Sequence, residues 1–227
     1  MNSSRFLTTG LLTSLLLAGS VSAIAADNTS APASDAAAKK DAEYTQVLEK
    51  RTAPMVAALE LGDSTKATRV QQRIIAQYKT LAAWQESNEA RLKELKKSKD
   101  TEAAKPEIAA IYAKRREITD AFLADLAKDL TPAQVDIVKD KITVNKLQVT
   151  YGAYLQQNPT LTEEQKKQIH TWLTEARDEA VSGTSMDEKS EIFGKYKGRI
   201  NNYLSKQGHD LKKADVEWKA RRDAEKK

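Results

Sequence analysis

The chain has 227 residues, with 37 Lys and Arg against 32 Asp and Glu, no cysteine and two histidines. The lack of cysteine excludes disulfides, a thiolate nucleophile, iron–sulfur clusters and a lipid anchor on cysteine, and two histidines leave almost no room for a structural zinc site. Hydrophobic residues make up 40% of the chain, which is enough for an ordinary soluble core. We therefore expect a folded protein that needs no metal and no cofactor.

The N-terminal residues have the pattern of a secretory signal peptide. Arg5 precedes a largely apolar run over 6–18, and small residues follow over 19–26. The run is short and rich in Thr and Ser compared with the ~20 apolar residues of a membrane span. Small residues at Ala23 and Ala25 predict cleavage after Ala25, with Ala23 as the second choice. We expect the mature protein in the periplasm or outside the cell, with no stable membrane insertion.

Two regions follow the predicted cleavage site. Residues 26–40 contain Ser, Pro and a run of Ala and have almost nothing to bury, which predicts a flexible linker. Residues 41–227 show helical periodicity almost throughout, which predicts a single all-α domain, a bundle of six to seven helices. The expected helices cover about 41–61, 64–97, 101–126, 132–141, 163–181, 186–207 and 211–227.

Several helix ends carry specific signals. Gly62 is expected to end the first helix in a left-handed conformation, and Asp63 or Ser64 to cap the next one. Thr131 and Thr162 each follow a leucine and precede a glutamine by three residues, so both are expected to form capping boxes. Between these two boxes, residues 142–154 are rich in β-branched and aromatic side chains, which predicts an irregular or extended segment.

The excess positive charge lies near the C-terminus. Residues 182–227 hold 12 basic and 8 acidic side chains, whereas residues 26–181 hold 24 of each. Cations, amides and tyrosines alternate there, and such groups hold a uronate or a sugar ring by bidentate bonds and stacking. The predicted site for an anionic oligosaccharide consists of Tyr154, Glu175, Arg177, Lys195, Tyr196, Lys197, Arg199 and Asn202. The alternative is an amphipathic helix with its aromatics inward and its cations in water.

The same residues are compatible with an enzyme. Glu175 and Asp178 lie three residues apart on one helical face, where two carboxylates can act as acid and base. A lyase or hydrolase would use Tyr196 or Glu175 as base beside Arg177 and Lys195. The alternative is that Glu175 and Asp178 have no catalytic role and lie at a solvent-exposed helix end. The chain has no nucleophile-elbow, zinc-protease, calcium-loop or dinucleotide motif, so no catalytic residue is assigned.

The partner classes follow from location and charge. Because we expect export, no nucleic-acid partner is expected for the basic end. Gly194 and Gly198 lie four residues apart and leave one helix face without side chains, which predicts close packing of another helix or a homodimer contact. An anionic oligosaccharide, a protein partner and a second copy of the chain therefore remain.

Specific sequence blocks carry a family resemblance. They are Leu-Thr-Pro-Ala-Gln-Val from residue 130, Thr143-Val-Asn-Lys146, Glu175-Ala-Arg177-Asp-Glu-Ala180 and Ile192-Phe-Gly-Lys-Tyr196-Lys-Gly-Arg-Ile200-Asn-Asn-Tyr203-Leu. From Lys40 to the C-terminus the chain resembles an uncharacterised family of secreted all-helical proteins from polysaccharide-degrading bacteria, labelled a domain of unknown function. The resemblance implies export and an association with glycan utilisation, and it supplies no activity. The paired Leu-Thr-x-x-Gln elements are also similar to those of periplasmic stress chaperones, which implies a chaperone-like protein as a third class.

Overall fold

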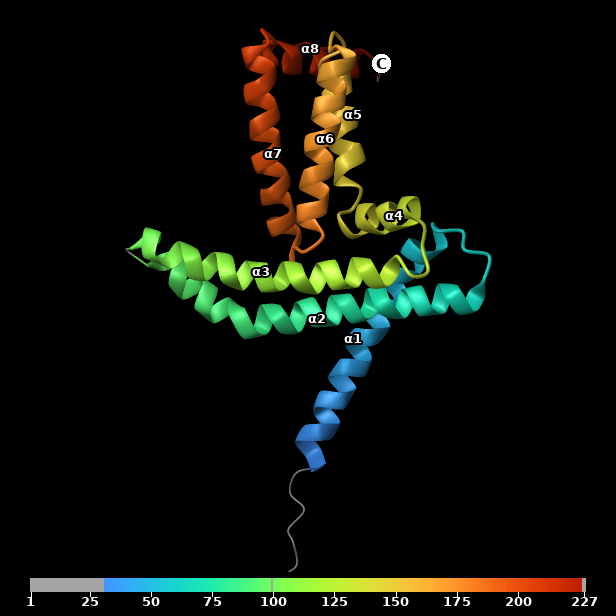
Figure 1. Cartoon of the computed structure of the whole chain (residues 1–227). Helices are drawn as coiled ribbons and strands as arrows, with labels where there is room; N and C mark the ends of the chain where they lie inside the picture. Colours follow the sequence, from blue (N-terminus) through green and yellow to red (C-terminus); the bar gives the residue numbers. More distant parts are fainter. Residues whose placement is uncertain (1–30, 99, 226–227) are drawn as a thin grey trace, which may run out of the picture. The chain divides into compact units, whose positions relative to one another are not determined.

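A computed structural model describes residues 31–98 and 100–225 of the chain (Figure 1). The predicted signal peptide, its cleavage site and residues 26–30 of the predicted linker lie outside the described residues. The chain divides into two units, Met1–Lys40 and Asp41–Lys227. In the first unit, the described residues 31–40 are helical, and their side chains are exposed from Asp35 onward.

All regular structure in the described residues is helical, which confirms the all-α prediction. The helices are α1 (Ala31–Ala57), α2 (Ser64–Lys97), α3 (Thr101–Leu126), α4 (Pro132–Ile142), α5 (Lys146–Gln157), α6 (Glu163–Ala180), α7 (Met186–Lys206) and α8 (Leu211–Glu225). Helices α2 and α3 form an antiparallel pair, while α5, α6 and α7 lie side by side with α8 across one end (Figure 1). None of the described helices is long and apolar enough to cross a membrane.

Two segments differ from their predicted conformation. Helix α1 begins at Ala31, so residues 31–40 of the predicted linker are helical; alanine has the highest helix propensity, and this segment is rich in it. The prediction of an irregular or extended segment over 142–154 is wrong for most of its length, because Lys146–Gln157 is helix α5. Only the connection at 143–145 is irregular, and Val144 and Asn145 there have positive φ angles of 49° and 55°.

The predicted helix caps are confirmed. Thr131 and Thr162 each accept a hydrogen bond from the amide of a glutamine three residues on, and each glutamine side chain accepts one from the threonine amide. Asp63 caps α2 by accepting from the Lys66 amide at 3.0 Å. Gly62 is left-handed as predicted, with φ of 68°, but it does not end α1, because the helix already stops at Ala57 and Glu60 also has a positive φ of 48°.

Thr131→Ala is expected to lower the free energy of unfolding by about 1 kcal/mol. The threonine hydroxyl lies 3.3 Å from the Gln134 amide, and alanine would leave this helix-terminal N–H without its side-chain acceptor. Thr131→Ser keeps the hydroxyl and serves as the control. Urea unfolding of the two variants measures the difference, and equal stability of the alanine variant and the wild type would contradict the role of the cap.

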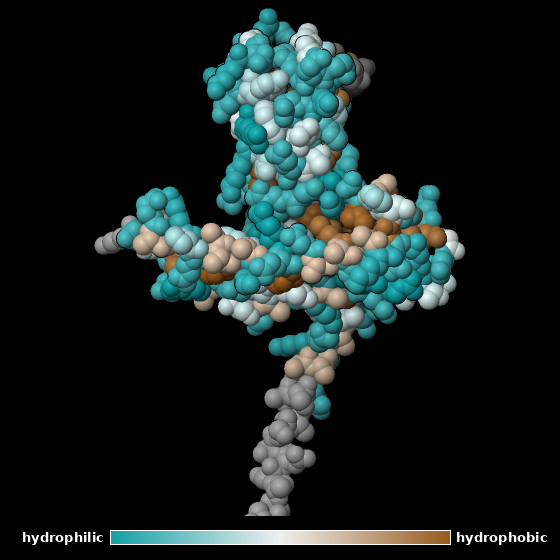
Figure 2. Space-filling model, viewed as in Figure 1, coloured by the Kyte–Doolittle hydropathy of each residue, from teal (hydrophilic) through white to brown (hydrophobic). Residues whose placement is uncertain are grey.

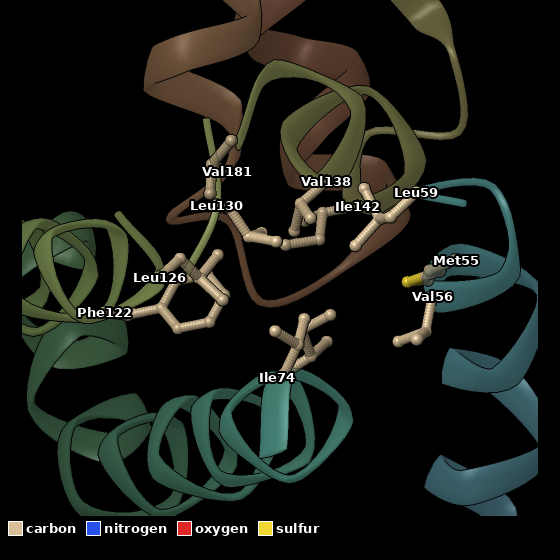
Figure 3. Packing of buried hydrophobic residues seen from close by; sticks show 11 residues of the cluster. Met55, Val56, Leu59, Ile74, Phe122, Leu126, Leu130, Val138, Ile142 and Val181 are labelled. Atoms are coloured by element: carbon tan, nitrogen blue, oxygen red, sulfur yellow. The ribbon is translucent and has the colours of Figure 1, made fainter. Parts of the chain in front are cut away.

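The first hydrophobic core joins α1, α2, α3 and α4. Its fully buried side chains include Val70, Ile74, Leu126 and Val138. Figure 3 shows Ile74 of α2 and Leu126 of α3 facing Val138 and Ile142 of α4, with Val181 contributed by the residue after α6. Hydrophobic side chains reach the surface along α4, where Val135 and Ile137 are only partly buried (Figure 2).

The second core holds α5, α6 and α7 together. It contains Leu147, Tyr154, Leu161, Ile169, Leu173, Ala176, Ala180, Ile192, Phe193, Ile200 and Leu204. Leu147 and Tyr154 share one face of α5, and burying that face stabilises a helix whose β-branched residues favour strand. On α7 the side chains at Ile192, Phe193 and Ile200 point into this core, so the opposite face of the helix is left to solvent.

The glycine pair of α7 does not mediate close packing with any other helix among the described residues. A Cβ atom added at Gly194 or at Gly198 would meet no described atom within 4 Å. The prediction of close helix packing there is therefore wrong for the described part of the chain, because both glycines lie on the solvent side of α7. The prediction of a contact with a second copy stays a prediction.

Candidate functional site

One face of the antiparallel pair α6 and α7 gathers cations around an aromatic pair, and we call it the Arg199 face. It is an open pocket of about 670 Å³, lined by Trp172, Lys195, Gly198, Arg199, Asn202, Tyr203 and Lys206. The lining residues that come from α7 recur at three- and four-residue steps, so they lie on one side of that helix. Trp172 comes from α6 and stands edge-on to Tyr203, with 5.3 Å between the ring centroids.

The guanidinium of Arg199 is held in a fixed place on this face. Its central carbon lies 4.4 Å from the centroid of the Trp172 ring. Its Nη1 atom donates to Glu175 Oε2 at 3.2 Å, while 54% of the arginine side chain remains exposed. A cation stacked on an indole and paired with one carboxylate retains free N–H donors for an anionic ligand.

The structure brings only part of the predicted site together. Lys195, Arg199 and Asn202 line the Arg199 face, and Glu175 reaches it through its ion pair with Arg199. The side chain of Lys197 is exposed on α7 and does not line the pocket.

The hydroxyl groups of the two tyrosines of the predicted site are hydrogen-bonded to other side chains of the protein. The Tyr154 hydroxyl donates to Asn201 Oδ1 at 2.7 Å inside the second core, and burial raises the pKa of Tyr154 to about 12. The Tyr196 hydroxyl donates to Glu179 Oε2 at 3.2 Å, and its pKa is raised by burial and by that carboxylate. Neither tyrosine lines the Arg199 face, and a raised pKa makes each a poor base at neutral pH.

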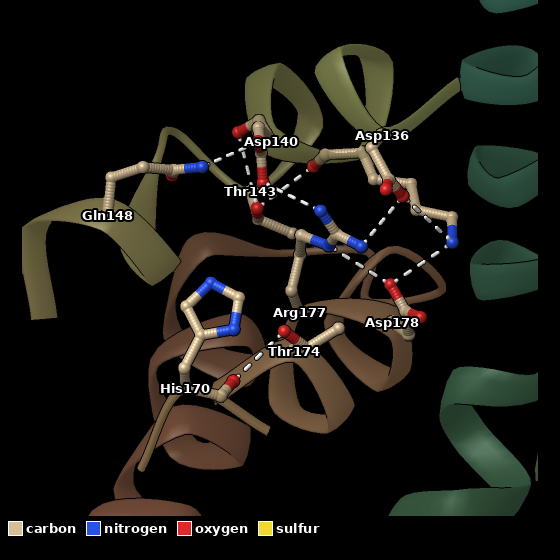
Figure 4. Close-up of polar contacts among 9 residues, drawn as sticks. Asp136, Asp140, Thr143, Gln148, His170, Thr174, Arg177 and Asp178 are labelled. Atoms are coloured by element: carbon tan, nitrogen blue, oxygen red, sulfur yellow. Dashed lines mark hydrogen bonds and ion pairs between the residues drawn. The ribbon is translucent and has the colours of Figure 1, made fainter. Parts of the chain in front are cut away.

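Arg177 is buried in a network of aspartates (Figure 4) and does not line the Arg199 face. Only 5% of the residue is exposed. Its guanidinium pairs with Asp136 at 2.8 Å, Asp140 at 3.2 Å and Asp178 at 3.0 Å. Burial lowers the pKa of Arg177, but the aspartates outweigh burial and raise it above its ordinary value. Arg177 thus joins α6 to α4, and the side chains proposed for a lyase or hydrolase are not collected in one place.

The acid pair considered for hydrolysis is divided in the same way. Glu175 pairs with Arg199 of α7, whereas Asp178 pairs with Arg177 and, at 3.2 Å, with Lys139 of α4. Each of the two carboxylates is therefore already paired with a cation from a different helix, Glu175 with one of α7 and Asp178 with one of α4.

A second cavity, which we call the Lys189 cavity, was not predicted from the sequence. It measures about 680 Å³, and its walls come from α1, α2, the residues Ile142 and Val144, and the segment 183–189. Lys189 is 5% exposed, and its Nζ atom donates to the Ile142 carbonyl oxygen at 3.1 Å. Burial, and after it the positive charge of Arg51, lower the pKa of Lys189 to about 8, although the nearby charge of Glu188 acts to raise it. The one sequence signal is a lysine in register with Ile192 and Phe193 on the inward face of α7.

The loop between α6 and α7 is fixed to α2 and α3 by a buried arginine. The guanidinium of Arg115 lies over the rings of both Trp84 and Tyr112, with its central carbon 4.9 Å and 4.7 Å from their centroids. It pairs with Glu188 Oε1 at 2.7 Å, and Glu188 Oε2 accepts from the Thr184 amide at 3.0 Å. These contacts hold the segment that forms one wall of the Lys189 cavity.

Three further observations bear on the chemistry and identity of the chain. In the described residues, no group of three or more His, Asp or Glu side chains is arranged to hold a metal ion. No curated protein matches the chain. A family model described as "Protein of unknown function (DUF3826)" matches residues 45–224, a span that includes all of α2 to α7. The chain therefore belongs to the DUF3826 family.

Proposed function

We propose that this protein is an exported helical binding protein that recognises an anionic oligosaccharide on the Arg199 face. The observation that carries the proposal is the guanidinium of Arg199, which Trp172 and Glu175 hold in place while more than half of the side chain stays exposed. A preorganised guanidinium loses little freedom when it forms two parallel bonds to a uronate carboxylate.

The neighbours of Arg199 suit the other groups of such a ligand. Lys195 and Lys206 add two cations to the pocket wall, so that its charge is positive even after Glu175 is counted. Asn202 offers an amide for sugar hydroxyls, and the Trp172 and Tyr203 rings offer apolar surface for the sugar carbons. The combination favours an acidic sugar chain over a neutral one.

Two sequence features support the proposed setting. The pattern over residues 1–25 favours export, with the mature protein in the periplasm or outside the cell. The resemblance to secreted proteins of polysaccharide-degrading bacteria favours a role in glycan utilisation. Among the described residues that line the Arg199 face there is no carboxylate pair, which favours binding over hydrolysis there.

Arg199→Gln is expected to weaken binding of a uronic-acid oligosaccharide by about tenfold or more, because charge-assisted hydrogen bonds to the carboxylate contribute about 1.5–3 kcal/mol. The matched control is Arg222→Gln. Arg222 also stacks on a tryptophan, with its central carbon 4.7 Å from the Trp218 ring centroid, but it lies on α8. Isothermal titration of both variants, the wild type and a neutral oligosaccharide gives the comparison.

The expected result is a loss of affinity in Arg199→Gln alone. If both variants bound the uronate oligosaccharide as tightly as the wild type, the Arg199 face would not be its site. If both lost affinity equally, the attraction would be a general effect of positive charge and the proposed site would also be wrong.

A further inference from the structure

We propose that the Lys189 cavity is an imine-forming site that takes a small carbonyl compound carrying a carboxylate. The cavity is separate from the Arg199 face, and the two share no lining residue. The proposal is therefore independent of oligosaccharide binding.

The surroundings of Lys189 disfavour its positive charge. Its side chain is almost completely removed from water, and the one acceptor that the described residues offer its Nζ atom is the Ile142 carbonyl oxygen. Among the described residues, no carboxylate lies within 4 Å of that nitrogen, because the neighbouring Glu188 is committed to Arg115. An ammonium group without a paired counter-charge is costly to bury, so burial shifts the equilibrium of Lys189 toward the neutral amine.

Arg51 is the other cation of the cavity wall. Its guanidinium carbon lies 5.6 Å from the centroid of the Tyr78 ring, and among the described residues it has no carboxylate within 4 Å. The remaining ionisable side chains of the wall are Tyr44, Tyr78, Glu86 and Glu89. Arg51 thus adds a free positive charge beside the amine, which disfavours protonation of Lys189 and attracts the carboxylate of a ligand.

The apolar part of the cavity wall suits a reaction that releases water. Met55, Leu81 and Ile142 are buried apolar side chains of this wall. The backbone at Gly183 packs tightly on the lysine stem, since a Cβ atom added there would lie 2.9 Å from Lys189 Cγ. The amine is therefore held in place in apolar surroundings, as a nucleophilic lysine requires.

The reaction balances without any further reagent. The lone pair of the neutral Nζ attacks the carbonyl carbon of the ligand, and the C=O π electrons move to oxygen. Proton transfer from nitrogen to that oxygen gives a carbinolamine, which loses water and leaves a C=N bond between ligand and lysine. A neutral amine keeps two N–H groups before the attack, so it attacks without first giving up the bond to Ile142.

Reductive trapping with glyoxylate, the smallest aldehyde that carries a carboxylate, tests the proposal. The full chain is incubated at pH 7.5 with glyoxylate and cyanoborohydride, and the modified lysines are located by peptide mass spectrometry. At pH 7.5, a pKa of about 8 in place of the ordinary 10.5 gives on the order of 200-fold more neutral amine. We therefore expect Lys189 to be labelled at least roughly tenfold faster than the exposed Lys195 on the same helix.

Two comparisons separate amine reactivity from carboxylate recognition. Glycolaldehyde has a similar size and no charge, so Arg51→Gln is expected to slow glyoxylate labelling of Lys189 several-fold more than it slows glycolaldehyde labelling. Lys189→Met identifies the adduct by its loss, and circular dichroism shows that each variant is folded. Arg222→Gln, at an arginine of α8 that does not line the cavity, is expected to label as the wild type does.

Two outcomes of these experiments would overturn the proposal. Labelling of exposed lysines without labelling of Lys189 would show that the amine is not a reactive, accessible nucleophile. Equal effects of Arg51→Gln on the two aldehydes would show that the cavity has no carboxylate subsite.

Discussion

Replacement of Arg177 by methionine is expected to lower the free energy of unfolding by about 3 kcal/mol, the low end of the cost of breaking a buried ion pair. The guanidinium is buried and pairs with three aspartates, and methionine would leave Asp140 without its cation. Asp136 and Asp178 are about half exposed, so water screens their charges and keeps the loss from being larger. Urea unfolding at pH 7 measures the effect.

Arg199→Met is the matched control for this prediction. Arg199 is an exposed arginine with one carboxylate partner, so its replacement is expected to change stability by less than about 1 kcal/mol. Equal stabilities of Arg177→Met and the wild type would contradict the structural role of the aspartate network. The same result would reopen the prediction that Arg177 binds ligand.

Lys189→Met is expected to make the protein more stable at pH 7 and to lose that advantage as the pH rises to 10.5. Below the folded-state pKa of about 8, both the folded and the unfolded chain carry the proton, and the folded state bears the full cost of burying it. Between pH 8 and 10.5 the folded state loses the proton first, so wild-type stability rises with pH. At about 1.4 kcal/mol per unit, the rise is about 3 kcal/mol.

The measurement is the difference in unfolding free energy between the variant and the wild type at several values of pH from 7 to 10.5. Taking a difference removes the titrations that both proteins share. Lys195→Met, at an exposed lysine of the same helix, is the control. A Lys189→Met difference that depends on pH no more than the Lys195→Met difference does would contradict the buried, unpaired state of the amine.

The helices were predictable because most of them are specified by local signals. The capping boxes at Thr131 and Thr162 and the cap at Asp63 act within three residues, so their pattern in the sequence is sufficient. Helix α5 is the exception, because its residues favour strand and its helical form depends on burying Leu147 and Tyr154 against distant helices. Such long-range burial is invisible in a local pattern.

The candidate site was predictable along α7 and not across helices. The spacing of Lys195, Arg199 and Asn202 places them on one face of any helix, and the structure confirms that they lie together. The contribution of Trp172 depends on how α6 packs on α7. Arg177 has the right charge for a ligand residue, but its partners Asp136 and Asp140 come from α4, and only the fold brings them together.

The buried lysine left a weaker trace in the sequence. Lys189 occupies an inward position on α7, where the periodicity calls for an apolar residue. A single charged residue in such a stripe is compatible with a side chain that bends outward to water. Its enclosure depends on α1, α2 and the connection after α4, which contact it from far along the chain.

The central claim is that the Arg199 face recognises the negative charge of a sugar chain. The most direct test is calorimetric titration of the protein with oligomers of galacturonate, glucuronate and mannuronate, each beside its methyl-esterified, uncharged counterpart. Saturable binding of at least one acidic oligomer, weakened by about tenfold or more in its neutral ester, is the predicted result. Absence of binding by every acidic oligomer, or equal binding of acid and ester, would contradict it.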